Sequence, residues 1–245
     1  MSLYDWYAKA LSDNKQILQR ITNVLVADSA FSKKPFIDNM LGIGFNVVSR
    51  LRHDAALYYL WEGDPTGKPG RPRVKGEKID FKNIDKSKVA ILDTDESNGQ
   101  VYALKAWCKS LHRKISLVIH ILPKGGHRLY FSTDESMSGR DVMEYYCTRF
   151  QIEFCFRDAK QFVGLTDSQA RDTRKLDFAF NSSFTAVNVA KIMCSEYNLS
   201  IWRLKALIIN AYYAQRIIDV FENNPNTQLN HEIVNEIFGF AADAA

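Results

Sequence analysis

One segment of the chain carries four polar side chains whose types and spacing suit chemistry on phosphates. Residues 146–160 read YCTRFQIEFCFRDAK and place a phenol, a guanidinium, a carboxylate and an ammonium at Tyr146, Arg149, Glu153 and Lys160. On one helix these groups project at about 0°, 300°, 340° and 320°, a stripe about 60° wide. A carboxylate in such a stripe can hold a divalent metal ion, and the two cations can hold phosphates.

A second interpretation of the same residues is structural. Arg149 and Glu153 are four positions apart and can form an ion pair on a solvated helix surface. Three phenylalanines, Phe150, Phe154 and Phe156, border the stripe, which a merely solvated face would not normally show. If the face is buried, its charges need partners. Geometry alone leaves both interpretations open.

The elements that must position this segment differ between the two halves of the chain. In the first half, apolar spacing predicts a helix over 4–20, a buried strand over 21–27 that ends at Asp28, a helix over 33–41 and a strand over 45–51. Residues 62–88 are rich in Gly, Pro and Lys. Strands are then expected over 89–92, 101–107, 115–122 and 128–131.

From Ser136 onward the pattern is helical. One helix is expected from about Asp141 to Phe162, ended by Gly164, and two more over about 178–196 and 201–222. The α/β sequence therefore divides into three expected parts. These are a core segment over 1–60, an inserted β-rich basic module over 61–134, and a helical part over 135–245 that carries Glu153.

Composition excludes several classes of protein. The 245 residues are 46% hydrophobic with a net charge of +4, as in an ordinary globular protein that can bind nucleic acid. No apolar run reaches the roughly 18 residues of a membrane span, and the N-terminus lacks the features of a signal peptide. The four cysteines form no CxxC pair, and the histidines lack metal-ligand spacing. We therefore expect a cytoplasmic protein with reduced thiols and no membrane partner.

The spacing Tyr146-x2-Arg149-x3-Glu153-x6-Lys160 resembles the Y-x2-R-x3-E-x6-K motif of bacterial insertion-sequence transposases with a DDE domain. The resemblance extends over nearly the whole chain. It includes VADSAFSKKPFID (26–38), VVSRLRHDAALY (47–58), GRPRVKGEKI (70–79), STD (132–134) and SQAR (168–171).

The resemblance implies a ribonuclease-H-like fold in which three acidic residues hold two divalent metal ions, Mg²⁺ or Mn²⁺. Two such ions clamp the attacking and leaving oxygens during attack on a phosphodiester bond. It makes Glu153 the third acid and assigns Tyr146, Arg149 and Lys160 to DNA contacts. The implied partner is double-stranded DNA at the transposon ends, bound by a homodimer, in the bacterial cytoplasm and in association with the nucleoid.

Two assignments compete for the other acids. Either Asp28 and Asp134 are the first and second acids, or Asp28 is the second and the first lies outside this chain. The expected order of strand, helix and strand after Asp28 matches what the resembled fold requires around its second acid, whereas no strand fits between Asp134 and Glu153. Asp28 is therefore predicted to be the second acid and a metal ligand, and Asp134 a loop residue before the helix.

This assignment predicts a partial ribonuclease-H-like fold with an inserted β-rich module and a helical C-terminal part. We expect the carboxylates of Asp28 and Glu153 to converge to about 4–8 Å, as ligands of shared hard cations do, with Asp134 farther from Glu153. The first acid and three strands would be missing, so the chain alone is expected not to cleave DNA.

The basic module is the second predicted DNA contact. Residues 53–133 hold 14 Lys and Arg against nine Asp and Glu, and the stretch KPGRPRVKGEK places Arg71, Arg73 and Lys75 in one loop. This loop could follow DNA phosphates, or it could be an ordinary solvated surface loop.

The predicted function is the metal-dependent cleavage and strand transfer of transposon DNA. The alternative is a non-catalytic DNA-binding remnant or regulator derived from a transposase. A ribonuclease-H-like nuclease unrelated to transposition would explain the acids but not the full four-residue motif.

Removing the charges of Arg149 and Lys160 together tests the phosphate contacts. We expect the chain to bind duplex DNA weakly, with strong salt dependence and little sequence preference. The double variant should bind more weakly and show a shallower slope of log affinity against log salt concentration. Fluorescence anisotropy at several salt concentrations measures both quantities, and an unchanged affinity and slope would contradict phosphate contacts at these residues.

Overall fold

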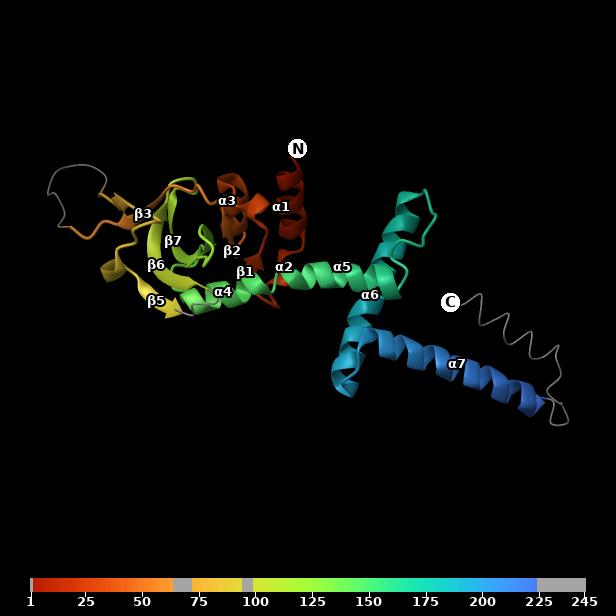
Figure 1. Ribbon diagram of the computed structural model, residues 1–245. Helices are drawn as coiled ribbons and strands as arrows, with labels where there is room; N and C mark the ends of the chain where they lie inside the picture. Colours follow the sequence, from red (N-terminus) through yellow and green to blue (C-terminus); the bar gives the residue numbers. More distant parts are fainter. Residues whose placement is uncertain (1, 64–71, 94–98, 224–245) are drawn as a thin grey trace. The chain divides into compact units, whose positions relative to one another are not determined.

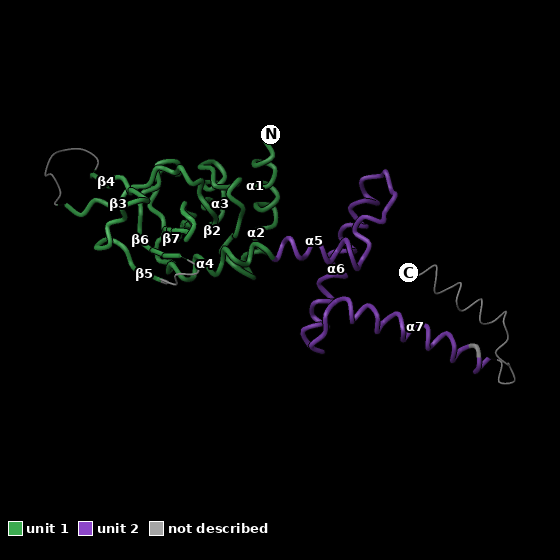
Figure 2. Tube along the Cα trace, viewed as in Figure 1, with its two compact units in different colours: residues 1–150 green, residues 151–245 purple. Residues whose placement is uncertain are grey.

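The computed structural model describes residues 2–63, 72–93 and 99–223. These residues belong to two compact units, residues 1–150 and 151–245 (Figures 1 and 2). The first unit holds the β-sheet and the second is helical. The chain is therefore a mixed α/β protein with a helical C-terminal part, as predicted.

One mixed sheet organises the first unit. Its strand order is β1-β2-β8-β7-β6-β3-β4, and β5 pairs with β6 beside this path. The strands are β1 (Val24–Val26), β2 (Asn46–Leu51), β3 (Leu57–Leu60), β4 (Lys75–Lys78), β5 (Ala90–Asp93), β6 (Gln100–Cys108), β7 (Arg113–Ile121) and β8 (His127–Ser132). The strands of the region predicted as an insertion thus share one sheet with β1 and β2.

Helices flank the sheet in the first unit, and the second unit consists of other helices. The first unit contains α1 (Leu3–Asp13), α2 (Lys15–Leu18), α3 (Lys34–Gly42) and α4 (Gly139–Cys147), with the 3₁₀ turns η1 (Ser29–Phe31) and η2 (Lys86–Lys88). The second unit contains α5 (Phe150–Phe162), whose first residue is still counted in the first unit, followed by α6 (Thr173–Tyr197) and α7 (Ile201–Asn223).

A strand, a helix and a second strand form the N-terminal half of the sheet, in the predicted order. β1 pairs parallel with β2, with Val24 opposite Asn46 and Val26 opposite Val48, and α3 is the connection between them. Pro35 suits the first turn of α3, where its missing N–H costs no hydrogen bond. Gly44 then adopts φ +92°, which returns the chain into β2.

A three-strand meander forms the other half. β6 and β7 share nine register pairs, and β7 pairs antiparallel with β8. β8 then pairs with β2, from Val48 opposite Ser132 to Leu51 opposite Leu129. This pairing joins the two halves of the sheet.

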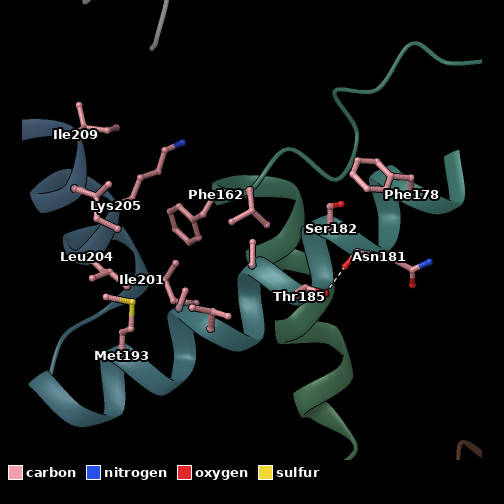
Figure 3. Close-up of a pocket in the computed structure, with 15 residues that line it drawn as sticks. Phe162, Phe178, Asn181, Ser182, Thr185, Met193, Ile201, Leu204, Lys205 and Ile209 are labelled. Atoms are coloured by element: carbon pink, nitrogen blue, oxygen red, sulfur yellow. Dashed lines mark hydrogen bonds between the residues drawn. The ribbon is translucent and has the colours of Figure 1, made fainter. Parts of the chain in front are cut away.

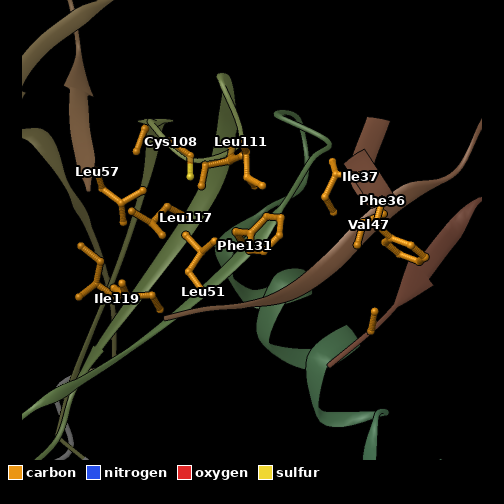
Figure 4. Packing of buried hydrophobic residues seen from close by; sticks show 14 of the residues in the cluster. Phe36, Ile37, Val47, Leu51, Leu57, Cys108, Leu111, Leu117, Ile119 and Phe131 are labelled. Carbon is orange, nitrogen blue, oxygen red and sulfur yellow. The ribbon is translucent and has the colours of Figure 1, made fainter. Parts of the chain in front are cut away.

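The two faces of the sheet bury two separate apolar cores. The larger core contains Ile37 from α3, packed with Val47, Leu117 and Phe131, all fully buried (Figure 4). Burying one such side chain contributes about 1.5–3 kcal/mol. The opposite face of the sheet packs against α4, through Val142.

Small residues let α4 approach the sheet closely. A Cβ atom on Gly139 would lie 2.5 Å from the Cβ of Ala103 and 2.8 Å from Cδ1 of Leu92. Beside it, the Ser116 hydroxyl on β7 donates a hydrogen bond of 2.8 Å to the carbonyl of Met137. These contacts position the start of α4 on β6 and β7.

The single helix expected from about Asp141 to Phe162 was a wrong prediction, because α4 ends at Cys147 and α5 begins at Phe150. At the break, the N–H groups of Thr148 and Arg149 bond to carbonyls three residues back, at 3.1 Å each. The Thr148 hydroxyl also donates to the carbonyl of Tyr145 at 2.6 Å. This local bonding tightens the turn and replaces the regular helical ladder.

In the second unit, α5 packs on α6 through a small core. Ala159, Leu165 and Val187 are buried there, and the Ser183 hydroxyl donates to the carbonyl of Val163 at 3.1 Å. Gly164 has φ +70° and follows the end of α5, as predicted.

An apolar groove of about 650 Å³ lies between the end of α5, α6 and α7 (Figure 3). Its side chains come from all three helices and include Phe162, Met193, Ile201 and Leu204. The groove leaves part of the apolar surface of this unit accessible.

Replacing Gly139 with Ala tests the close approach of α4. The added methyl would meet the Cβ atom of Ala103, which cannot move away unless the strand backbone moves. We therefore expect the free energy of unfolding to fall by about 1–3 kcal/mol. Urea denaturation measures this change. Gly42→Ala is the matched control, since its Cβ would meet nothing within 4 Å, and it should leave stability unchanged or raise it by up to about 1 kcal/mol. Equal losses in both variants would contradict the tight packing at Gly139.

Candidate DNA-processing site

Asp28 lies where β1 ends and the chain turns into η1. The N–H of Ala27, just before it, donates to the carbonyl of Val48 at 3.0 Å, so the pairing with β2 continues to the edge of the site. The exposed carboxylate of Asp28 caps η1 and accepts hydrogen bonds from the N–H and, at 3.1 Å, the hydroxyl of Ser29. The carboxylate is therefore oriented by the turn that follows it.

A serine pair ties this turn to β2. The hydroxyl groups of Ser32 and Ser49 are 2.9 Å apart, and the Ser32 hydroxyl also donates to the carbonyl of Arg50 at 2.9 Å. Ser49 is fully buried. Because buried hydroxyl groups are costly without partners, this network holds the loop after Asp28 against the strand that carries Arg50.

Tyr146, near the end of α4, packs over the sheet beside this loop. Its ring lies 4.9 Å from that of Tyr130 on β8, and Tyr130 is directly opposite Arg50 on β2. Burial raises the pKa of the Tyr146 phenol above its ordinary value of 10.0. Arg50 and Arg149 lower this pKa in part, while Asp28 and Tyr130 raise it further.

The first unit therefore brings together Asp28, Tyr146 and Arg149, three of the predicted site residues. The Arg149 guanidinium lies 4.8 Å from the ring centre of Phe150. Arg50, Arg149 and Asp28 lie close enough to Tyr146 to influence the pKa of its phenol. Together these four side chains form a cluster that can bind a phosphodiester and orient it beside Asp28.

Glu153 and Lys160 lie on α5 in the second unit. Both side chains are exposed. They are seven residues apart and so share one face of α5, two turns from each other. The buried positions Asp158 and Ala159 lie on another face, against α6.

Asp134, the competing acid, lies in the loop between β8 and α4. Its carboxylate accepts hydrogen bonds from the Ser136 hydroxyl at 2.6 Å and the Ser136 N–H at 2.8 Å, and these bonds lower its pKa. The cap of α4 is Ser138, which accepts from the N–H of Asp141 at 3.2 Å. Asp134 thus stabilises the loop before the helix and does not cap the helix itself.

The predicted basic loop is described from Pro72 onward, and Arg71 lies outside the described residues. The Arg73 guanidinium stacks 3.8 Å above the centre of the Trp61 ring, and its Nε donates to the carbonyl of Lys75 at 3.1 Å. Lys75 begins β4, and both cations are exposed.

The carboxylates of Asp28 and Glu153 have the donor chemistry that Mg²⁺ and Mn²⁺ prefer. Asp28 uses Oδ1 for Ser29, and neither side chain is buried. Within residues 2–63, 72–93 and 99–223, no group of three or more His, Cys, Asp or Glu side chains is placed to hold a metal ion. The Asp28 and Glu153 carboxylates are therefore each of the kind that such an ion binds.

Arg50 and Tyr130 were not among the predicted site residues. The signal in the sequence is the alternation of Arg50 and Arg52 at the end of the predicted strand, but only Arg50 lies in β2. Arg52 follows the strand and forms an exposed ion pair with Asp54 at 3.1 Å. The contribution of Tyr130 depends on the pairing of β2 with β8, which the sequence does not reveal.

The fold and the cluster define a class of mixed α/β protein in which a carboxylate follows the first strand of a strand–helix–strand unit, next to a phenol and two guanidinium groups. The family model described as a transposase DDE domain matches residues 9–189. The chain therefore belongs to the DDE transposase family, whose members act in DNA transposition and recombination.

A comparison with curated proteins finds no match. None of the helices that the structure describes is long and apolar enough to cross a membrane.

The titration of Tyr146 tests the cluster. A difference titration of the wild type against Tyr146→Phe, followed by phenolate absorbance, should show this phenol ionising above pH 10. Arg50→Gln should raise its pKa further, and Asp28→Asn should lower it. Because the folded-state pKa is raised, the wild type should lose stability relative to Tyr146→Phe as the pH rises from about 10 through that pKa. A Tyr146 pKa that neither variant moves would contradict the proximity of these groups.

Proposed function

We propose that the chain supplies two of the acids of a DNA transposase catalytic site, Asp28 and Glu153, for metal-dependent cleavage and strand transfer of transposon DNA. One observation carries the proposal for the first unit. Asp28 follows β1 in a parallel strand–helix–strand unit and lies within electrostatic reach of Tyr146, whose pKa Arg50 and Arg149 also influence. Membership of the family and the four-residue motif support Glu153 as the third acid, and Asp28 would be the second.

In this proposal Asp28 and Glu153 would hold Mg²⁺ or Mn²⁺, which when bound supplies charge to activate a nucleophile and stabilise the leaving oxygen. Tyr146 and Arg149 bind the phosphodiester, the phenol as a neutral hydrogen-bond donor, since the pKa of a tyrosine is about 10 and burial raises it further here. Lys160, Arg73 and Lys75 bind phosphates farther along double-stranded DNA, and Arg71 is predicted to do the same.

The alternative function is a non-catalytic DNA-binding regulator derived from a transposase. Arg50 and Arg149 in the cluster, and Arg73 and Lys75 around the start of β4, would serve this function as well, since phosphate binding needs no metal. A regulator would also need no group of three metal-binding side chains, and the described residues contain none. A homodimer in the DNA complex stays a prediction under either function.

Metal binding tests the two acids directly. Calorimetric titration with Mn²⁺ should show that Asp28→Asn and Glu153→Gln each lose about tenfold or more in affinity, as expected for the loss of a ligand. Asp134→Asn and Glu144→Gln are matched controls that remove a carboxylate from the loop before α4 and from α4 itself, and both should bind Mn²⁺ as the wild type does. A loss of affinity in Asp134→Asn but not in Asp28→Asn would reverse the assignment.

A cleavage assay tests whether the set of acids is complete. Because the first acid is predicted to be missing, we expect a donor plasmid with Mg²⁺ or Mn²⁺ to stay intact. Strand cleavage that disappears in Glu153→Gln would show that a complete set of acids lies within this chain, with Asp134 the first candidate for the missing one. Intact plasmid and persistent DNA binding, together with Mn²⁺ affinity that neither Asp28→Asn nor Glu153→Gln changes, would identify the regulator.

A further inference from the structure

A row of aromatic and basic side chains crosses the far half of the sheet. Tyr58 on β3 is directly opposite Trp107 on β6 and Lys78 on β4, and Trp107 is directly opposite Lys114 on β7. Residues opposite each other in antiparallel strands point to the same face of the sheet. The order Lys78–Tyr58–Trp107–Lys114 therefore runs across four strands on one face.

This row belongs to the face of the sheet that α4 covers elsewhere. Val101 lies on β6 six residues before Trp107, which in a strand is the same face, and it is buried beneath α4. Tyr58 and Trp107 are only partly buried, and Lys78 and Lys114 are exposed. The helix thus covers one part of this face and leaves the aromatic part accessible.

Further cations surround the two rings. The Lys75 ammonium lies 5.7 Å from the Tyr58 ring centre and 5.9 Å from that of Trp107. Lys105 is two residues from Trp107 on β6, on the same face, and is exposed. A cavity of about 600 Å³ opens beside the rings, bordered by Tyr58, Lys75, Trp107 and His112. We call Tyr58, Trp107, Lys75, Lys78, Lys105 and Lys114 the aromatic-basic platform.

The chemistry of this platform suits unpaired nucleotides better than a duplex. In a duplex the faces of the bases are already stacked on one another, and only their edges are accessible in the grooves. An unpaired base exposes both faces and can stack on a tyrosine or tryptophan ring, while lysines bind the adjacent phosphates. The cavity is large enough to admit a base beside the rings.

We propose that the aromatic-basic platform binds an unpaired stretch of DNA. This proposal rests on the proposed function for the choice of DNA as the ligand, and it adds a strand-separated substrate to that function. Bases stack on Tyr58 and Trp107, and Lys75, Lys78, Lys105 and Lys114 bind the phosphates on either side.

Oligonucleotide binding by the full chain tests the proposal. Anisotropy of a labelled twelve-nucleotide thymidine strand, in buffer with EDTA, should show salt-dependent binding that Trp107→Ala and Tyr58→Ala each weaken about tenfold or more, as the loss of one stacked base predicts. Trp107→Phe keeps a ring and should restore most of the affinity. Binding of a hairpin duplex with the same number of phosphates should change little in all three variants.

Trp202→Ala is the matched control, because Trp202 is an exposed tryptophan on α7 in the second unit. It should bind the single strand as the wild type does, and circular dichroism should show that every variant is folded. A uridine strand of equal length separates DNA from RNA: weaker binding of RNA supports the proposal, and tighter binding of RNA overturns the choice of DNA. Equal affinity of Trp107→Ala and wild type for the single strand, or no single-strand binding by the folded chain, also overturns it.

The EDTA makes this result independent of the metal ligands. A failure of Asp28 and Glu153 to bind Mn²⁺ would leave the single-strand result intact, and a failure of the platform would leave the Mn²⁺ titration intact.

Discussion

The first unit depends on the antiparallel pairing between β2 and β8. This pairing joins the β1–α3–β2 half of the sheet to the meander, and it sets Arg50 directly opposite Tyr130. Tyr146 can then pack on Tyr130 while it lies within electrostatic reach of Asp28, which belongs to the other half. The loop after Asp28 is held against β2, since the Ser32 hydroxyl lies 2.9 Å from the buried Ser49 hydroxyl of that strand. Without the pairing of β2 with β8, the aspartate and the phenol would belong to separate substructures.

Residue size decides what the two parts of one sheet face can do. Where the face carries Ala103 and Ser116, α4 approaches through Gly139 and excludes water from the core beneath it. Where it carries Trp107 and Tyr58, large rings stand partly exposed. The covered part supports the arginine and tyrosine cluster, and the open part offers flat aromatic surface with positive charge around it.

Local pattern predicted the elements that have strong apolar periodicity. The strand before Asp28, the helix and strand after it, the meander strands and the two long C-terminal helices all occur close to their expected ranges. β3 and β4 were missed, because each has only four residues and β4, KGEK, has no apolar side chain. The break at Thr148 depends on one hydroxyl bonded to its own helix, which apolar periodicity does not report. The aromatic-basic platform depends on register between strands far apart in sequence, and no local pattern encodes that register.

The meander has a further consequence, for the order of folding. β6, β7 and β8 follow one another along the chain with short connections, so their pairing closes small loops at little entropic cost. The pairing of β2 with β8 joins positions as much as 84 residues apart, Val48 and Ser132. Contacts between distant positions form slowly because the loop must be closed before they contribute. The meander is therefore expected to form early and the cluster around Asp28 last, so an incompletely folded chain would retain strands but have no assembled site.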